Sequence, residues 1–208
     1  MIPKHYYMLI DTEGVRTEKG NLCYDIGIII IDRKNKVYAK YSFIIQEIYY
    51  SNLMSSYYYK LKRKLYDKEI SEGKRKVLTF ATIQEVIRLL IDKWNCQAII
   101  GHYIRYDKYS LNSTAKFLLN KEKFFVQNIP LWCTYTMARQ IYACRPTFKM
   151  FCGDKLNYSV ENLYRYISGN SKFNEQHTGL EDAMIEKEIF YHILRQHKKI
   201  RKTYYIEG

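Results

Sequence analysis

The chain has 208 residues, and 34 Lys and Arg against 21 Asp and Glu give it a formal net charge of +13. With 47% hydrophobic and 26% charged residues it is not an intrinsically disordered chain, and its length is typical of one domain with a sizeable core. The longest apolar run, from Ile26 to Ile31, is too short to span a bilayer, and the N-terminus lacks the pattern of a secretory signal. We therefore expect a soluble cytoplasmic protein that does not bind a membrane.

The charge and the cysteines both bear on the partner and the compartment. A net charge of +13 on one domain favours a polyanionic partner, most often nucleic acid, although a biased genome composition would also enrich lysine, isoleucine and the 22 tyrosines. The five cysteines have no zinc-cluster spacing, so we interpret them as reduced thiols that are mostly buried.

The chain opens with three apolar segments joined by short connections, which predict antiparallel strands. These segments are residues 5–11, 23–32 and 37–45. Residues 46–76 then interleave tyrosines with lysines and arginines without a proline, which predicts a helical insertion with a basic face. Further along, residues 97–101 predict a short buried strand, and apolar stripes predict helices on both sides of it. With their caps, these helices are expected at 82–94, 107–119, 134–142, 159–167 and 178–196.

Three of these helices also show start signals. Thr82 with Glu85, and Thr178 with Glu181, have the spacing of a capping box. Ser159 is the expected N-cap of the third. The order of elements predicts a single α/β domain over residues 1–208 with a mixed sheet.

Four acids stand out because a basic protein has few carboxylates to gather. Asp11 and Glu13 lie two residues apart on the first strand, so both side chains point to one face of the sheet. Such a pair is also typical of a solvated strand edge. Asp107 and Asp182 each head an otherwise apolar helical stripe and should point inward, although the helix dipole alone also favours an acid in a first turn. His177 lies just before the cap of the last helix.

Order, spacing and flanking residues together resemble the DEDDh branch of the DnaQ-like 3′–5′ exonuclease family. The three motifs are Ile10–Gly14 (IDTEG), Gly101–Asp107 (GHYIRYD) and His177–Ala183 (HTGLEDA). The resemblance covers most of the chain except residues 46–76. It departs from the family at Tyr103, where the family usually has Asn. Supporting stretches are Trp132–Thr134, Ala138–Arg139 and Tyr158–Leu163.

The resemblance implies a ribonuclease H-like fold, with a mixed sheet of about five strands, the first three antiparallel, flanked by helices. It also implies two divalent cations, Mg²⁺ or Mn²⁺, and Asp11 would contact both of them. Glu13 and Asp182 would complete the first cation site, and Asp107 would help to hold the second. His177 would be the general base, since its ordinary pKa near 6.5 suits proton transfer near neutral pH. His102 is expected to brace the loop before Asp107.

The implied reaction is hydrolysis of phosphodiester bonds at single-stranded 3′ ends of nucleic acid. The motifs do not separate DNA from RNA, and DNA is only weakly favoured as the substrate class. The residues expected to touch this substrate are Thr12, Gly14, Arg105 and Tyr106. Residues 49–66 are either a further binding surface or a helical hairpin whose tyrosines cover the sheet, and the basic tail 195–202 either contacts the nucleic-acid backbone or is a solvated face. The prediction also allows a homodimer.

Two other functions stay open on the same fold. One is a catalytically silent module that binds nucleic acid. The other is an interaction protein that uses residues 46–76 to block or recruit a nucleoprotein machine. All four motif acids and the motif histidine are present, which favours the enzyme.

Overall fold

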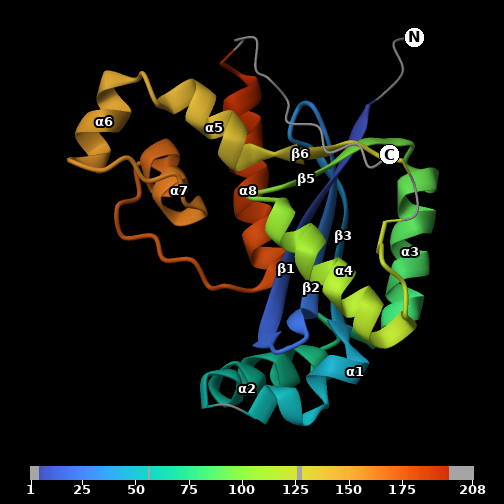
Figure 1. Ribbon diagram of the computed structural model, residues 1–208. Coiled ribbons are helices and arrows are strands. Elements are labelled where there is room, and N and C mark those ends of the chain that lie inside the picture. The colour runs from blue at the N-terminus through green and yellow to red at the C-terminus, as the bar shows by residue number, and fades with distance from the viewer. Residues whose placement is uncertain (1–4, 56, 126–127, 197–208) are drawn as a thin grey trace.

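A computed structural model describes residues 5–55, 57–125 and 128–196, which form a six-stranded sheet with helices on both faces (Figure 1). The strands lie in the order β4-β3-β2-β1-β5-β6. Within the described ranges, no helix is both long enough and apolar enough to cross a membrane. The basic tail beyond residue 196 lies outside the described residues.

The first three strands form the antiparallel set that the sequence predicts. Their bounds are Tyr6–Thr17 for β1, Gly20–Asp32 for β2 and Val37–Ile45 for β3. β1 does not end at Asp11 as predicted but continues to Thr17, because its second half keeps pairing with β2. The register shifts between Glu13 and Gly14, so the two acids of the first motif lie on a strand just before an irregularity.

Three parallel pairings complete the sheet, which makes it mixed, as predicted. β4 (Lys76–Leu78) pairs with β3, β5 (Cys96–Gly101) pairs with β1, and β6 (Leu131–Cys133) pairs with β5. The sheet therefore has six strands rather than about five. β4 and β6 were not predicted, because three residues are too few to show an alternating pattern.

Helices follow β3, β4, β5 and β6. The insertion predicted at 46–76 is mainly helical as far as Ser71, and its last residue, Lys76, begins β4. The helices are α1 (Gln46–Tyr49), a 3₁₀ turn η1 (Asn52–Ser55), α2 (Tyr57–Ser71), α3 (Phe80–Lys93), α4 (Arg105–Leu119), α5 (Thr134–Tyr142), α6 (Pro146–Cys152), α7 (Val160–Ser168) and α8 (Gly179–Leu194). The sequence did not predict α6, a short helix that begins with a proline.

Helix caps agree with prediction at one helix and differ at two. The Ser159 side chain accepts the N–H of Asn162 and caps α7 as expected. α3 is capped by Thr79 rather than by Thr82, because the helix begins at Phe80 and Thr82 lies in its first turn. The Thr178 hydroxyl donates to Glu181 at 2.6 Å, so the predicted capping box of α8 does not form.

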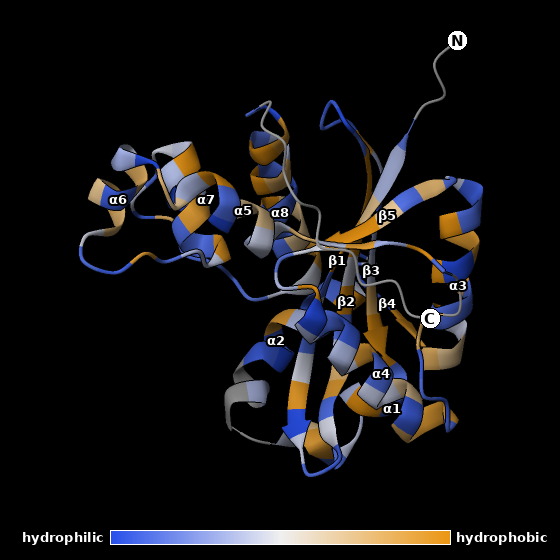
Figure 2. Cartoon of the chain, turned by 45° about the horizontal axis from the view of Figure 1, so that its top comes forward, coloured by the Kyte–Doolittle hydropathy of each residue, from blue (hydrophilic) through white to orange (hydrophobic). Residues whose placement is uncertain are grey.

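Side chains alternate along β1 and divide the core into two parts. Met8 and Ile10 belong to the part covered by α1 to α4, whereas Tyr7 and Leu9 belong to the part covered by α5 to α8. β2 is buried along nearly its whole length because both of its faces are covered. Figure 2 shows the same arrangement, with hydrophobic residues along the central strands and a mainly hydrophilic α2.

The tyrosines of the insertion help to cover the sheet. Tyr49 and Tyr66 are fully buried and belong to the core beneath α2. Tyr50, by contrast, is 56% exposed. The structure therefore supports the sheet-covering interpretation for the inner tyrosines and leaves the outer face of the insertion available for contacts.

Candidate active site

The acids of the first motif lie on the sheet face that α8 covers. Asp11 and Glu13 share the odd-numbered face of β1 with Tyr7 and Leu9, which pack in the core on the α8 side. Asp182 lies in the first turn of α8 and is 3% exposed. The sequence prediction that Asp182 points inward is therefore confirmed.

Two glycines let α8 come close enough to bring Asp182 to the strand acids. Gly27 of β2 pairs directly with Asp11 across the sheet. A Cβ on Gly179, the first residue of α8, would lie 2.6 Å from the backbone N of Gly27 and 3.1 Å from the carbonyl O of Asp11. Because real Cβ atoms do not approach backbone atoms to 2.6 Å, the start of α8 can lie against β1 and β2 only with glycine at this crossing.

Asp107 approaches the strand acids from α4, the helix that follows β5. It lies in the first turn of α4, after the loop that follows β5, and is 3% exposed. Its Oδ1 accepts the backbone N–H of Thr12 at 3.0 Å and the Thr12 hydroxyl at 2.9 Å. The residue between the two strand acids thus fixes Asp107 next to them.

His177 completes the group that the motifs predict. Its backbone has a φ of 55°, and its side chain is 60% exposed. One ring nitrogen of His177 and one carboxylate oxygen each of Glu13 and Asp182 all lie within 4.8 Å of one another. The structure therefore brings together residues from β1, the loop before α8 and α8 itself.

The carboxyl groups are held where their charged forms are disfavoured. Burial is the main cause, and it raises the pKa of Asp182 to about 8 and that of Glu13 to about 7. The pKa of Asp107 is raised to about 7, again chiefly by burial, against the hydrogen bonds from Thr12. Burial and the neighbouring carboxylates also raise the pKa of Asp11 well above its ordinary value.

Unpaired buried oxygens show that protein groups do not fully satisfy this cluster. Asp182 Oδ1 and Glu186 Oε2 are buried and have no hydrogen-bond partner among the described residues. Buried carboxylates with raised pKa values and unsatisfied oxygens fit a site for hard divalent cations, which prefer oxygen ligands and compensate negative charge.

The insertion contributes a cation of its own to the site. The Lys62 ammonium of α2 lies 3.5 Å from Glu13 Oε2 and donates to the carbonyl O of His177 at 2.6 Å. The Tyr59 hydroxyl donates to the carbonyl O of Gly14 at 3.1 Å. Figure 1 shows α2 against the end of β1 at which these contacts lie. The sequence alone did not predict that the insertion touches the motif residues.

A buried ionic network ties the insertion to the start of α8. Asp25 of β2 is fully buried and accepts from Tyr66 at 2.8 Å, from Arg75 at 3.0 Å and from the N–H of Gly179 at 3.0 Å. Arg75 also donates to Glu181 at 2.9 Å. This network holds the first turn of α8, which carries Asp182, in place. It was missed because its members lie 41 to 154 residues apart in sequence.

Residues of the second motif shape the loop before Asp107. The His102 ring contacts Thr134 Oγ1 at 2.9 Å and the carbonyl O of Tyr158 at 2.8 Å, which agrees with the predicted bracing role. Burial lowers the pKa of His102 to about 4, so the ring is neutral near pH 7. Tyr103 has a φ of 63°, a left-handed conformation that Asn adopts more readily than Tyr, which explains why Asn suits this position.

The residues predicted to touch substrate lie around the acids in different environments. Arg105 is exposed, and Tyr106 is 44% exposed, with its hydroxyl accepting from Asn21. Thr12 is 5% exposed, and both of its donors are used by Asp107. Gly14 is constrained by packing, because a Cβ there would lie 2.3 Å from Asn21 Nδ2. Their contacts with a substrate stay predictions.

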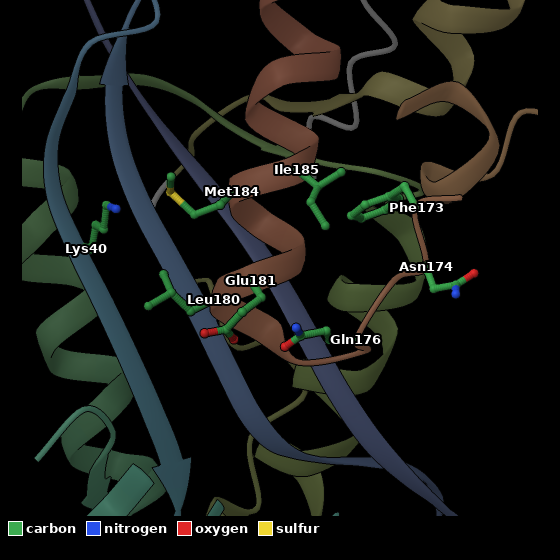
Figure 3. A pocket seen from close by; sticks show the side chains of 8 residues that line it. All are labelled: Lys40, Phe173, Asn174, Gln176, Leu180, Glu181, Met184 and Ile185. Atoms are coloured by element: carbon green, nitrogen blue, oxygen red, sulfur yellow. The ribbon is translucent and has the colours of Figure 1, made fainter. Parts of the chain in front are cut away.

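A pocket of about 310 Å³ lies on another side of α8 and is separate from this cluster (Figure 3). It is lined by Leu180, Met184 and Ile185 of α8 and by Phe173 and other residues of the preceding loop. None of the predicted catalytic residues lines it. The candidate site is therefore the acid cluster.

Comparison with known proteins identifies the fold. No protein-family model and no curated protein sequence matches the chain. Among solved structures, the nuclease domain of 3′hExo, a DEDDh family member bound to rAMP, superposes with a TM-score of 0.70 at 10% identity over 97% of this chain and 98% of that one. A 3′-exonuclease that recognises the 3′ end of the histone mRNA stem-loop has a TM-score of 0.67 at 10% identity, covering 99% of this chain and 91% of that one.

Exonuclease I of E. coli, in complex with single-stranded DNA, is also similar, with a lower TM-score and over a smaller share of its own length. Its TM-score is 0.60 at 13% identity, and the match covers 95% of this chain and 41% of that one. The likeness confirms the predicted ribonuclease H-like mixed sheet. The chain thus has the fold of the DEDDh 3′-exonuclease domains, as its sequence motifs predict.

Proposed function

We propose that the chain is a metal-dependent 3′–5′ exonuclease that hydrolyses phosphodiester bonds at single-stranded 3′ ends of nucleic acid. The observation that supports this most is the convergence of Glu13, Asp182 and His177. Asp11 lies on the same face of β1 as Glu13, and Thr12 fixes Asp107 beside them. Carboxylates buried together in this way are stabilised by cations when they are ionised.

The acid cluster fits two divalent cations of the Mg²⁺ type. Asp11, Glu13 and Asp182 would hold the first cation, and Asp11 with Asp107 would hold the second. When bound, such cations lower the pKa of water and compensate the charge that develops on the phosphoryl oxygens. The unpaired Oδ1 of Asp182 supports this assignment, because a carboxylate oxygen buried without a donor is stabilised by a cation.

His177 is suited to take the proton from the attacking water. Its ring lies on the solvent side of the cluster, is 60% exposed, and has a nitrogen within reach of the Glu13 and Asp182 carboxylates. Glu175 Oε2 lies 3.9 Å from His177 Nδ1, so a carboxyl group stands beside the ring that would take the proton. Exposure lets the ring pass the proton to solvent after each cleavage.

Exposed aromatic and basic groups lie beside the acids and are suited to binding single-stranded nucleic acid. Tyr103 and Tyr106 are 53% and 44% exposed on either side of the exposed Arg105. Aromatic rings stack with unpaired bases, and Arg contacts phosphate. The similar structures are described with rAMP, the histone mRNA stem-loop or single-stranded DNA, so the choice of DNA as the favoured substrate class stays a prediction.

One observation favours a different function, a silent domain that binds nucleic acid without cutting it. The Lys62 ammonium lies beside Glu13, where it compensates part of the charge that a cation would otherwise compensate. A silent domain would bind single strands with the same affinity in the presence of Mg²⁺ and of chelator, and would release no nucleotides.

The test uses 3′-labelled single-stranded DNA and RNA of the same sequence. We expect the wild-type protein to release labelled mononucleotides with Mg²⁺ or Mn²⁺ and none with EDTA. Asp11→Asn should abolish release while binding of the strand is kept, and Asp92→Asn, an exposed acid of α3, is the control that should cleave normally. Binding without release by the wild-type protein with either metal would establish the silent alternative.

A further inference from the structure

Glu186 is a fifth acid beside the cluster, and the three motifs do not include it. It lies one helical turn after Asp182 on α8, and residues four apart share a face of a helix. It is 1% exposed. The sequence prediction missed Glu186, because the inward stripe of the last helix was continued from Asp182 to Ile185 and not to the acid. The spacing of four residues between Asp182 and Glu186 could have indicated it.

The two oxygens of Glu186 have different surroundings. Oε1 accepts the backbone N–H of His102 at 2.9 Å and so anchors the loop that leads to Asp107. Oε2 is buried and has no hydrogen-bond partner in the described part of the chain. One oxygen therefore has a structural partner, and the other is left for a ligand.

The position of Glu186 is on the Asp107 side of the cluster. A Cβ on Gly101, the residue before His102, would lie 3.3 Å from Asp107 Oδ2 and 3.0 Å from the carbonyl O of Ile10, the residue before Asp11. Burial and the Asp107 charge also raise the pKa of Glu186. Its hydrogen bond to His102 places it where the β5–α4 loop meets α8. Asp11 and Asp107 are the residues assigned above to the second cation.

A buried carboxylate with one free oxygen costs stability unless a proton or a cation compensates it. A proton on Oε2 would leave a buried O–H donor, which itself needs an acceptor. A divalent cation bound by Glu186 together with Asp11 and Asp107 would offset two of their three negative charges.

We propose that Glu186 is a fifth carboxylate of the cation site, whose Oε2 binds the second divalent cation directly or through one water while Oε1 holds the loop of His102. The inference rests on the proposed function, because it assumes that Asp11 and Asp107 bind a cation. It adds a consequence that the motif residues alone do not give: occupancy of the second site is coupled to the order of the loop that leads to Asp107.

The test is Mn²⁺ binding to the wild-type protein and to Glu186→Gln, measured by calorimetry and by the electron paramagnetic resonance signal of free Mn²⁺. Glutamine keeps the oxygen that accepts from His102 but removes the charge. The control is Glu188→Gln, an acid on the same helix that bonds to Asn35 and Lys187 instead. We expect wild type and the control to bind two Mn²⁺ ions.

Glu186→Gln should bind one of the two ions about 10- to 100-fold more weakly and the other unchanged, as for groups that support metal ligands. Without metal, its melting temperature should not fall, since glutamine keeps the oxygen that accepts from His102 and carries no buried charge. Unchanged affinity for both ions, or a lower melting temperature without metal, would show that Glu186 only anchors the loop. That outcome leaves the exonuclease proposal standing, whereas absence of Mn²⁺ binding by the wild-type protein overturns both.

Discussion

Lys62 of the insertion and Glu13 of the central strand form an ion pair, with 3.5 Å between the ammonium and the carboxylate. Because the same ammonium donates to the carbonyl O of His177, one side chain joins α2, β1 and the loop of the proposed base. The insertion is therefore part of the wall of the candidate site, in addition to covering the sheet.

Replacing Lys62 with Met should separate two effects of this contact. The Lys62 charge lowers the pKa of Glu13 against the effect of burial, and it repels a divalent cation at the same carboxylate. We expect Lys62→Met to bind Mn²⁺ about 3- to 10-fold more tightly, in line with the loss of a partly buried charge, and to cleave more slowly because the His177 loop is no longer held. Calorimetry and single-turnover cleavage measure the two effects.

The matched control for this change is Lys64→Met, an exposed lysine two residues along α2. It should leave both quantities within error of wild type. Weaker Mn²⁺ binding in Lys62→Met would mean that the ammonium supports the cation site rather than competing with it.

The stability of the metal-free protein should fall as the pH rises. Asp182 and Glu13 have pKa values of about 8 and 7 in the fold, against ordinary values of 3.8 and 4.5. The folded state thus binds protons more tightly than the unfolded state, so the stability from these groups is complete below about pH 4 and is lost as the pH rises to about 8. Mg²⁺ replaces these protons and should remove much of the loss.

Thermal unfolding with EDTA at pH 5 and pH 8 checks this linkage. Asp182→Asn should melt higher than wild type at pH 8 by at least about 2–4 °C, the shift that 1 kcal/mol gives for a domain of this size, and by less at pH 5. An equal difference at both pH values would contradict the linkage.

Patterns that repeat along the sequence predicted much of this fold, and single long-range contacts did not. The isoleucine-rich strands, the bounds of α5 and the inward direction of Asp107 and Asp182 follow from periodicity. The contacts of Lys62 with His177 and of Glu186 with His102 join residues 115 and 84 positions apart, and no local spacing encodes them. The three-residue strands β4 and β6 likewise exist only because longer neighbours pair with them.

The close crossing of Gly27 and Gly179 should tolerate no side chain. In Gly179→Ala the new Cβ would lie 2.6 Å from the Gly27 backbone, so α8 must move away from β1. We expect a loss of about 1–3 kcal/mol in the free energy of unfolding, together with weaker Mn²⁺ binding, because Asp182 moves with the helix. Urea unfolding and calorimetry measure the two.

Gly153→Ala is a useful comparison for this variant. No atom of the described residues lies within 4 Å of its added Cβ, so only its backbone conformation opposes the change. It should lose about 1–3 kcal/mol from backbone strain, because φ of 69° with ψ of −137° is a conformation for glycine, without affecting Mn²⁺ binding. If Gly179→Ala binds Mn²⁺ like wild type, the crossing does not position Asp182.

Tyr103 is expected to lower the stability of the protein and to contact the substrate. Its left-handed backbone costs a tyrosine more than an asparagine, while its ring, which also contacts Tyr135 at 5.6 Å, is 53% exposed beside the site. We expect Tyr103→Asn to be more stable by about 0.5–1 kcal/mol and to bind single strands about 5- to 10-fold more weakly, as for loss of one stacking ring. Unchanged binding would exclude Tyr103 as a substrate contact.

The central claim is that the buried acids cut nucleic acid with the help of divalent cations. The most direct measurement is the release of mononucleotides from a 3′-labelled single strand by the wild-type protein and by Asp182→Asn at saturating Mg²⁺. The account predicts release by wild type that stops with EDTA, and a loss of at least about 100-fold in the variant, which still binds the strand. Release that persists in Asp182→Asn, or that is indifferent to EDTA, would contradict it.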